Sequence, residues 1–178
     1  MVNQTIKNHA LLQSNYSLLK GGKLEHQEGE RFLQFSLKKK VSGLVFLQDL
    51  RGTVEIALTD ILPVPQVPEY WLGITNYQGE AVWILDLAQL VNDSHWLRKS
   101  PIASSGMAML INIEGKTIGL LVEQIQGIEN YDPKSCLPIA EVNTNANTKS
   151  LFKGYFLSPK GEPSMLLDVD SLFYLLQE

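Results

Sequence analysis

The segment Gly79-Glu80-Ala81-Val82-Trp83-Ile84-Leu85-Asp86-Leu87 has a counterpart in the second half of the chain, Gly161-Glu162-Pro163-Ser164-Met165-Leu166-Leu167-Asp168-Val169. Both copies begin with Gly-Glu, continue into an apolar run that ends at Asp, and are matched without a gap. A continuous apolar run of this length is typical of a strand that is covered on both faces. Because a repeat at this scale indicates duplicated structural units, it decides how the rest of the chain is interpreted.

Working outward from this pair, further segments match in the same order in both halves. They are Phe32–Leu37 with Ala108–Ile113, Gly43-Leu44-Val45 with Gly119-Leu120-Leu121, Ile61–Val64 with Cys136–Ile139, and Gly73 with Gly154. The polar run over residues 141–148 accounts for most of the difference in spacing and is expected to be an inserted loop. The repeat therefore predicts two similar subdomains, about residues 31–103 and 104–178, after an N-terminal arm (residues 1–30) that we expect to be mobile.

The local patterns within each unit favour short strands. Leu33, Phe35 and Leu37 alternate with Gln34 and Ser36, which is the period of a half-buried strand. Helix is expected mainly over residues 170–177, with Asp168 or Asp170 as N-cap. Several short strands between turns indicate small barrels or a sandwich, and units this small are expected to share apolar surface.

Composition excludes several classes of protein. The 178 residues are 44% hydrophobic and carry a net charge of −4, so the chain lacks the overall basic character of a nucleic-acid-binding protein. It contains no apolar run of the roughly 20 residues that a bilayer-spanning helix needs, and no signal-peptide pattern. The single cysteine, Cys136, excludes cysteine-based zinc clusters and internal disulfides, and a cytoplasmic location is expected.

The residues that are candidates for catalysis are two aspartates and the single cysteine, and each is better explained by a structural role. Asp86 and Asp168 each follow an apolar strand and precede a helical signal, so we interpret them as helix N-caps; the alternative is a catalytic carboxylate. Cys136 occupies the position of Ile61 in the repeat and is interpreted as a small buried residue; the alternative is a reactive thiol. No phosphate loop or metal-ligand spacing is present, so no cofactor and no metal are expected.

What remains is protein surface. The connector that contains Val64, Pro65 and Pro68 is stiff because proline fixes the backbone, and it ends in Tyr70-Trp71. Gly73 and Gly79 are expected to supply positive φ or to allow another backbone to approach closely. Small β-units also leave strand edges that either need protection or recruit another chain.

These residues resemble the CheW-like domain of bacterial chemosensory adaptors. The resemblance lies in Val64-Pro65-x-x-Pro68, in Gly73-x-x-Asn76-x-x-Gly79 with Leu85-Asp86-Leu87, and in second-half segments that contain Gly119, Gly154 and Asp168. It covers about Arg31 to Gln177. It implies an all-β fold of two five-stranded SH3-like barrels around a shared hydrophobic core, with a short C-terminal helix, and an adaptor rather than an enzyme.

The resemblance also implies partners and contact residues. CheW-type proteins bridge the cytoplasmic tips of chemoreceptors and the regulatory domain of the CheA histidine kinase, with which they can form rings; neither nucleic acid nor membrane insertion is involved. The implied receptor-contact positions are Asn76, Gln78, Gly79 and Ile128. The family usually has arginine where this chain has Gln78, and neutral glutamine cannot reproduce a five-donor guanidinium. Trp83, where many relatives have proline, resembles cyanobacterial-type members that are linked to phototaxis or pilus-based motility.

Three hypotheses follow. The first is a cytoplasmic adaptor without catalytic activity that couples receptors to a CheA-type kinase, with possible recruitment to membrane receptor arrays. The second, motivated by Gln78, is a divergent regulatory module that engages the kinase but not ordinary receptors. The third is an enzyme or small-molecule binder that uses a cleft between the barrels.

Overall fold

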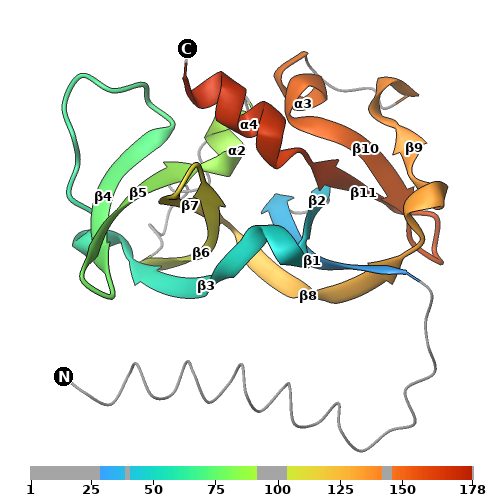
Figure 1. Ribbon diagram of the computed structural model, residues 1–178, viewed down its shortest axis with the longest axis horizontal. Helices are drawn as coiled ribbons and strands as arrows, with labels where there is room; N and C mark the ends of the chain where they lie inside the picture. Colours follow the sequence, from blue (N-terminus) through green and yellow to red (C-terminus); the bar gives the residue numbers. More distant parts are fainter. Residues whose placement is uncertain (1–28, 39–40, 92–103, 142–145, 178) are drawn as a thin grey trace, which may run out of the picture.

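The computed structural model describes residues 29–38, 41–91, 104–141 and 146–177, most of which lie in strands (Figure 1). The predicted N-terminal arm up to residue 28, Lys39-Lys40 and residues 142–145 of the predicted inserted loop lie outside these residues, whereas residues 146–148 of that loop are the start of a helix. The elements are β1 (Glu30–Lys38), β2 (Val41–Phe46), η1 (Leu47–Asp49), β3 (Leu50–Ala57), η2 (Leu58–Asp60), β4 (Trp71–Tyr77), β5 (Glu80–Asp86), α2 (Leu87–Leu90), β6 (Ser105–Ile113), β7 (Lys116–Val122), β8 (Gln124–Tyr131), η4 (Pro133–Ser135), β9 (Leu137–Pro138), η5 (Ile139–Glu141), α3 (Ala146–Leu151), β10 (Phe152–Leu157), β11 (Pro163–Leu167) and α4 (Val169–Leu176).

The strands form two sheets. Sheet A has six strands in the order β8-β1-β2-β11-β10-β9, and sheet B has five in the order β3-β6-β7-β5-β4. The sixth strand of sheet A, β9, is only two residues long, and its counterpart in sheet B is the single bridge between Leu62 and Ile74. The predicted all-β fold with two SH3-like subdomains is confirmed.

The five main strands and the helix that follows them occur in the same order in both halves, as the repeat predicts, and the second half also contains β9, η5 and α3. The two halves nevertheless exchange strands. The first hairpin of the chain, β1–β2, lies in sheet A with β8, β10 and β11 from the second half. Reciprocally, the hairpin β6–β7 lies in sheet B with β3, β4 and β5 from the first half. The predicted division near residue 103 therefore does not coincide with the division between the sheets.

In each sheet, one parallel pairing joins a strand of the first half to a strand of the second half. β2 pairs parallel with β11, and β5 pairs parallel with β7, whereas the other pairings are antiparallel. Figure 1 shows the consequence, since blue β1–β2 lies among orange and red strands at one end of the molecule.

Alternation along the strands divides the core in three. Leu33 and Phe35 of sheet A and Met109 and Leu120 of sheet B belong to one large buried cluster, which confirms the predicted shared core. The residues on the opposite faces fill two separate clusters. One, around Ile84 and Leu110, belongs to sheet B, and the other, around Phe32 and Phe156, belongs to sheet A.

One helix follows the last strand of each half. α2 follows β5, and α4, the predicted C-terminal helix, follows β11; both lie over the same side of the molecule in Figure 1. Leu87 of α2 and Leu172 of α4 are fully buried in the shared cluster, so both helices cover the shared core.

Candidate protein interface

The β4–β5 turn presents three of the four predicted contact residues. Tyr77 pairs with Glu80, and between them Gln78 and Gly79 both have positive φ, 53° and 87°, as a type I′ hairpin turn requires. The Asn76 Oδ1 accepts a hydrogen bond of 3.2 Å from the Gly79 N–H. The Asn76 side chain therefore stabilises the turn. Asn76, Gln78 and Gly79 are all exposed, so the turn points outward.

A second turn of the same kind lies beside it. Asn112 Oδ1 accepts a hydrogen bond of 2.9 Å from the Gly115 N–H, and Glu114 and Gly115 have φ of 48° and 79°. Because β5 and β7 are adjacent and parallel, both turns lie at the same end of sheet B. The same Asn-x-x-Gly spacing occurs in both turns and was a signal in the sequence that could have predicted the second one.

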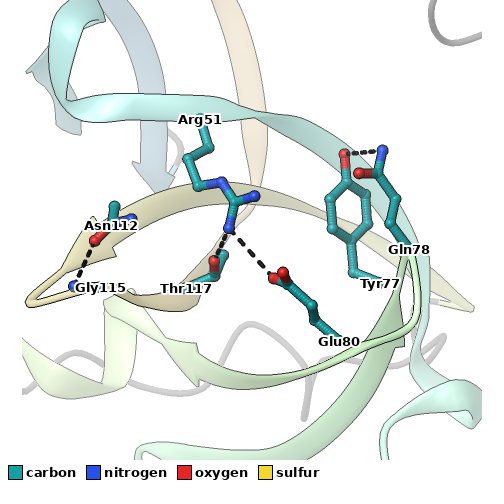
Figure 2. A network of polar contacts seen from close by, with 7 residues as sticks. All are labelled: Arg51, Tyr77, Gln78, Glu80, Asn112, Gly115 and Thr117. Carbon is teal, nitrogen blue, oxygen red and sulfur yellow. Dashed lines mark hydrogen bonds and ion pairs between the residues drawn. The ribbon is translucent and has the colours of Figure 1, made fainter.

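Arg51, also missed, lies between the two turns (Figure 2). Its Nη1 donates to the Thr117 hydroxyl and lies 3.3 Å from the Glu80 carboxylate. No pattern in the sequence marked this residue, because its role arises only when β3, β5 and β7 lie in one sheet.

Gln78 does not project a charge from the turn. Its side-chain amide donates to the Tyr77 hydroxyl at 3.2 Å, so its donor group is directed at its own neighbour (Figure 2). A groove of about 90 Å³ lies beside the turn, between the edge strands β3 and β4, and Asn76 and Tyr77 line it.

Ile128, the fourth predicted contact residue, lies on a different sheet. It is in β8, the edge strand of sheet A, opposite Leu33, and 49% of it is exposed. β8 and β3 are equivalent strands of the two halves and each forms one edge of a sheet. The structure therefore places the four candidates on two sheets, three in one turn and one on an edge strand.

The motif residues have structural roles. Gly73 has φ of 137°, and a Cβ there would overlap the Leu62 carbonyl group; a Cβ on Gly154 would overlap Cys136 and lie 2.7 Å from the Leu137 oxygen. These glycines let the preceding segment cross closely in each half. A Cβ on Gly119 would meet the Ile84 side chain at 2.5 Å.

The two aspartates are N-caps. Buried Asp86 accepts from the Gln89 N–H at 3.2 Å, and Asp168 accepts from the N–H groups of Asp170 and Ser171. Lys153 lies 3.6 Å from the Asp168 carboxylate. These contacts stabilise the starts of α2 and α4.

The proline connector lies on the surface. Pro65 and Pro68 are exposed and Val64 is half-buried, and Gln66 between the prolines has φ of 63°. A non-glycine residue in this region is uncommon, so the connector is held in an unusual conformation.

Burial raises the pKa of the Cys136 thiol, whereas a backbone hydrogen bond at Tyr155 and the charge of Lys153 oppose the rise. The thiol is therefore less ionised than usual, the reverse of what a nucleophilic cysteine requires.

Within the described ranges, no group of three or more His, Cys, Asp and Glu residues could hold a metal ion. The same residues include no helix long and apolar enough to cross a membrane.

Two interleaved barrels with exposed edges and a presented turn define an all-β, double-barrel protein of the SH3-like two-subdomain type. The CheW-like domain family matches residues 31–177, nearly everything that the structure describes. The chain therefore belongs to the CheW-like family, whose members are non-catalytic scaffold and adaptor proteins of chemotaxis signalling.

Individual relatives are distant. The "Chemotaxis protein CheW" of Rhizobium meliloti (strain 1021) is 21% identical over 131 residues, which cover 74% of this chain and 77% of that protein. The crystal structure of scaffolding protein TtCheW from Thermoanaerobacter tengcongensis superimposes with a TM-score of 0.66 at 18% identity, over 79% of this chain and 89% of that one. At this identity the structural likeness shows the shared fold.

Proposed function

We propose that this protein is an adaptor that couples chemoreceptor-type sensors to a CheA-type histidine kinase. The observation that carries the proposal is that the CheW-like match and the interleaved double barrel span the same residues, 31–177. The adaptor acts in the cytoplasm, is recruited to receptor arrays, and joins rings with the kinase regulatory domain. It transmits the receptor's state through contacts that differ between receptor states, because only differential binding can bias an equilibrium. Individual contacts need not be tight, since clustering supplies avidity.

The β4–β5 turn and Ile128 are the proposed receptor contacts. Asn76 and Gly79 lie in a turn whose conformation is fixed before any partner binds, which lowers the entropic cost of association. Ile128 supplies exposed apolar area on an edge strand.

Titration of the full chain with the regulatory domain of the cognate kinase tests the kinase half of the proposal. Binding at micromolar concentration is expected, and no binding at high micromolar concentration contradicts it. For the receptor half, Ile128→Glu is expected to weaken binding of a receptor tip. Leu157→Glu is the matched control, because Leu157 is also 49% exposed but lies on β10. Equal loss in both variants argues against a specific contact at Ile128.

A second candidate function is a regulatory module that occupies the kinase without binding ordinary receptors. The observation that favours it is neutral Gln78, whose amide is directed at Tyr77. Gln78→Arg is then expected to increase receptor association, with Gln66→Arg as control, because Gln66 is also exposed and has φ of 63°. Strong receptor binding by the unmodified chain contradicts this second function.

A further inference from the structure

A second and larger groove lies at the turn end of sheet B, with a volume of about 630 Å³. It is lined by Ala81 and Trp83 of β5, whereas the β3–β4 groove is lined by Val82 and Ile84 of the same strand. Because successive strand residues point to opposite faces, the two grooves lie on opposite faces of the sheet.

The apolar part of the groove consists of an aromatic pair and one aliphatic side chain. The rings of Trp71 and Trp83 meet edge to face, with centroids 5.4 Å apart, and Ile118 lies alongside. Trp83 is 36% exposed, an unusual amount of indole surface to leave in water. Rigid aromatic residues of this kind are the side chains most often found as anchors in protein interfaces.

The charged part is cationic although the chain carries a net charge of −4. Arg51, Lys116 and Glu80 are the ionisable side chains that line the groove. Among the described residues, Glu80 and Thr117 bind Nη1 of Arg51, and no contact there uses the donors on Nε and Nη2 (Figure 2). Across the part of the chain that the structure describes, no carboxylate pairs with Lys116.

Two segments that line the groove have their backbone conformation fixed before any partner binds. Lys116 follows the Asn112–Gly115 turn directly, and Val67 follows Gln66, whose positive φ lies within the proline connector. Strained backbone of this kind persists only where the surroundings hold it, and it clusters at functional sites.

We propose that this groove binds a peptide segment of a partner protein that combines large apolar side chains with carboxylates. The lining Arg51 and Glu80 side chains are 42% and 60% exposed, so the groove is an open surface and not the enclosed cleft that a small molecule needs. Residues 1–28 do not match it by charge, because they carry Lys7, Lys20 and Lys23 against Glu25 and Glu28. The groove lies on the face of sheet B away from the β3–β4 groove, and the test below uses neither receptor nor kinase, so it separates this inference from the proposed coupling.

The test uses the ¹⁵N-labelled full chain and two short synthetic peptides. One is built of Glu-Leu repeats, and the other has Lys in place of each Glu. We expect the Glu-Leu peptide alone to shift the indole signals of Trp71 and Trp83 and the amide signals of Lys116, Thr117 and Ile118. Trp83→Ala is expected to weaken binding about tenfold, as for an interface anchor. Lys116→Glu is expected to weaken it about two- to fivefold, as for an exposed charge. Lys160→Glu, the same charge change at an exposed turn of sheet A, is the control and is expected to have no effect.

Three results overturn the proposal. The first is equal binding of the two peptides, and the second is equal loss on Lys116→Glu and Lys160→Glu. The third is a change of the two indole signals without peptide, either with protein concentration or on removal of residues 1–28, which would identify a second copy or the chain's own N-terminus as the occupant. Because neither receptor nor kinase is present, failure here leaves the proposed function untouched, and the reverse also holds.

Discussion

Leu44 of β2 lies opposite Leu166 of β11 in a parallel pair of strands, and both side chains are buried in the same cluster with Phe32 and Phe156. The two leucines come from opposite halves of the chain. The corresponding parallel pair in sheet B places Ile84 of β5 opposite Gly119 of β7, which also come from opposite halves. Neither sheet can therefore be completed by one half alone.

Separate fragments, residues 29–103 and 104–178, are accordingly expected to be unfolded by themselves and to fold when mixed. Fragment 29–103 lacks the β6–β7 hairpin of sheet B, and fragment 104–178 lacks the β1–β2 hairpin of sheet A, so each fragment leaves the shared cluster exposed. Circular dichroism and urea unfolding of each fragment and of the mixture measure this. A cooperative transition in either isolated fragment would contradict the exchange of hairpins.

Gly73→Ala is expected to lower the free energy of unfolding by about 3 kcal/mol, because it combines strained backbone with overpacking. The backbone φ there is 137°, and the new Cβ would lie 2.7 Å from the Leu62 carbonyl carbon. Gly52→Ala is the matched control, since a Cβ at that position meets nothing within 4 Å. Urea denaturation of both variants gives the comparison, and equal losses would remove the argument for close crossing at Gly73.

Asp86→Ala is expected to lower the free energy of unfolding by about 1–2 kcal/mol through loss of the α2 N-cap. Asp86→Asn keeps an oxygen that can accept from the Gln89 N–H and should lose much less. Thermal unfolding of the two variants separates the roles. Equal stability of wild type and Asp86→Ala would contradict the stabilising role of the cap.

Asp49→Asn is expected to raise the free energy of unfolding at neutral pH. Burial raises the pKa of Asp49 above its usual 3.8, with Asp168, Asp170 and Glu30 adding to the rise and Lys153 opposing it. The stability that comes from the protonated form is present in full below the unfolded-state pKa and is lost as the pH rises through the folded-state pKa.

The advantage of Asp49→Asn should therefore be present near neutral pH, shrink as the pH falls through the folded-state pKa of Asp49, and be lost below the unfolded-state pKa. Urea unfolding of wild type and variant between acid and neutral pH measures it. A variant that is less stable than wild type at neutral pH would mean that the attraction to Lys153 outweighs the burial of the carboxylate.

The elements with regular alternation or with a repeated partner were predictable from sequence. β1, β5 and α4 follow from local periodicity, and the order of elements follows from the duplication. The exchange of hairpins did not follow, because a duplicated sequence is compatible with both separate and interleaved pairing. Only the contacts between distant strands, such as β2 with β11, distinguish the two arrangements.

Register was lost where the backbone bulges. The gapless match places Gly43 on Gly119, but Gly43 lies opposite Phe35 and Gly119 opposite Leu110, the counterpart of Gln34. The register shift between Ser36 and Lys38 accounts for the difference of one residue. In β8 a similar shift places Ile128 opposite Leu33 and Ile125 opposite Phe35, although the two isoleucines are three residues apart. Sequence periodicity cannot reveal such a shift. After a shift of one residue, the side chains that follow lie on the opposite face from the one that regular alternation predicts.

α3 was missed for a different reason. The sequence favours a polar loop there, because Asn147, Thr148 and Ser150 are polar and weak helix formers. Leu151 is nevertheless fully buried in the shared cluster, and α3 contacts α4, so tertiary packing stabilises the helix.

Among the candidate site residues, Gln78 and Ile128 could be predicted from the family resemblance. Arg51 could not, because only the order of the strands brings it to Thr117 and Glu80.

The reciprocal exchange of hairpins also fixes when the protein can fold during its synthesis. β1 and β2 leave the ribosome first, but their neighbours β8 and β11 are made much later, and β11 is the last strand of the chain. A nascent chain that stops anywhere before Leu167 leaves sheet A open beside β2 and leaves Leu44 without its partner Leu166. Prematurely terminated products are therefore left with exposed apolar strands for chaperones and proteases to recognise, and only finished copies are competent to assemble.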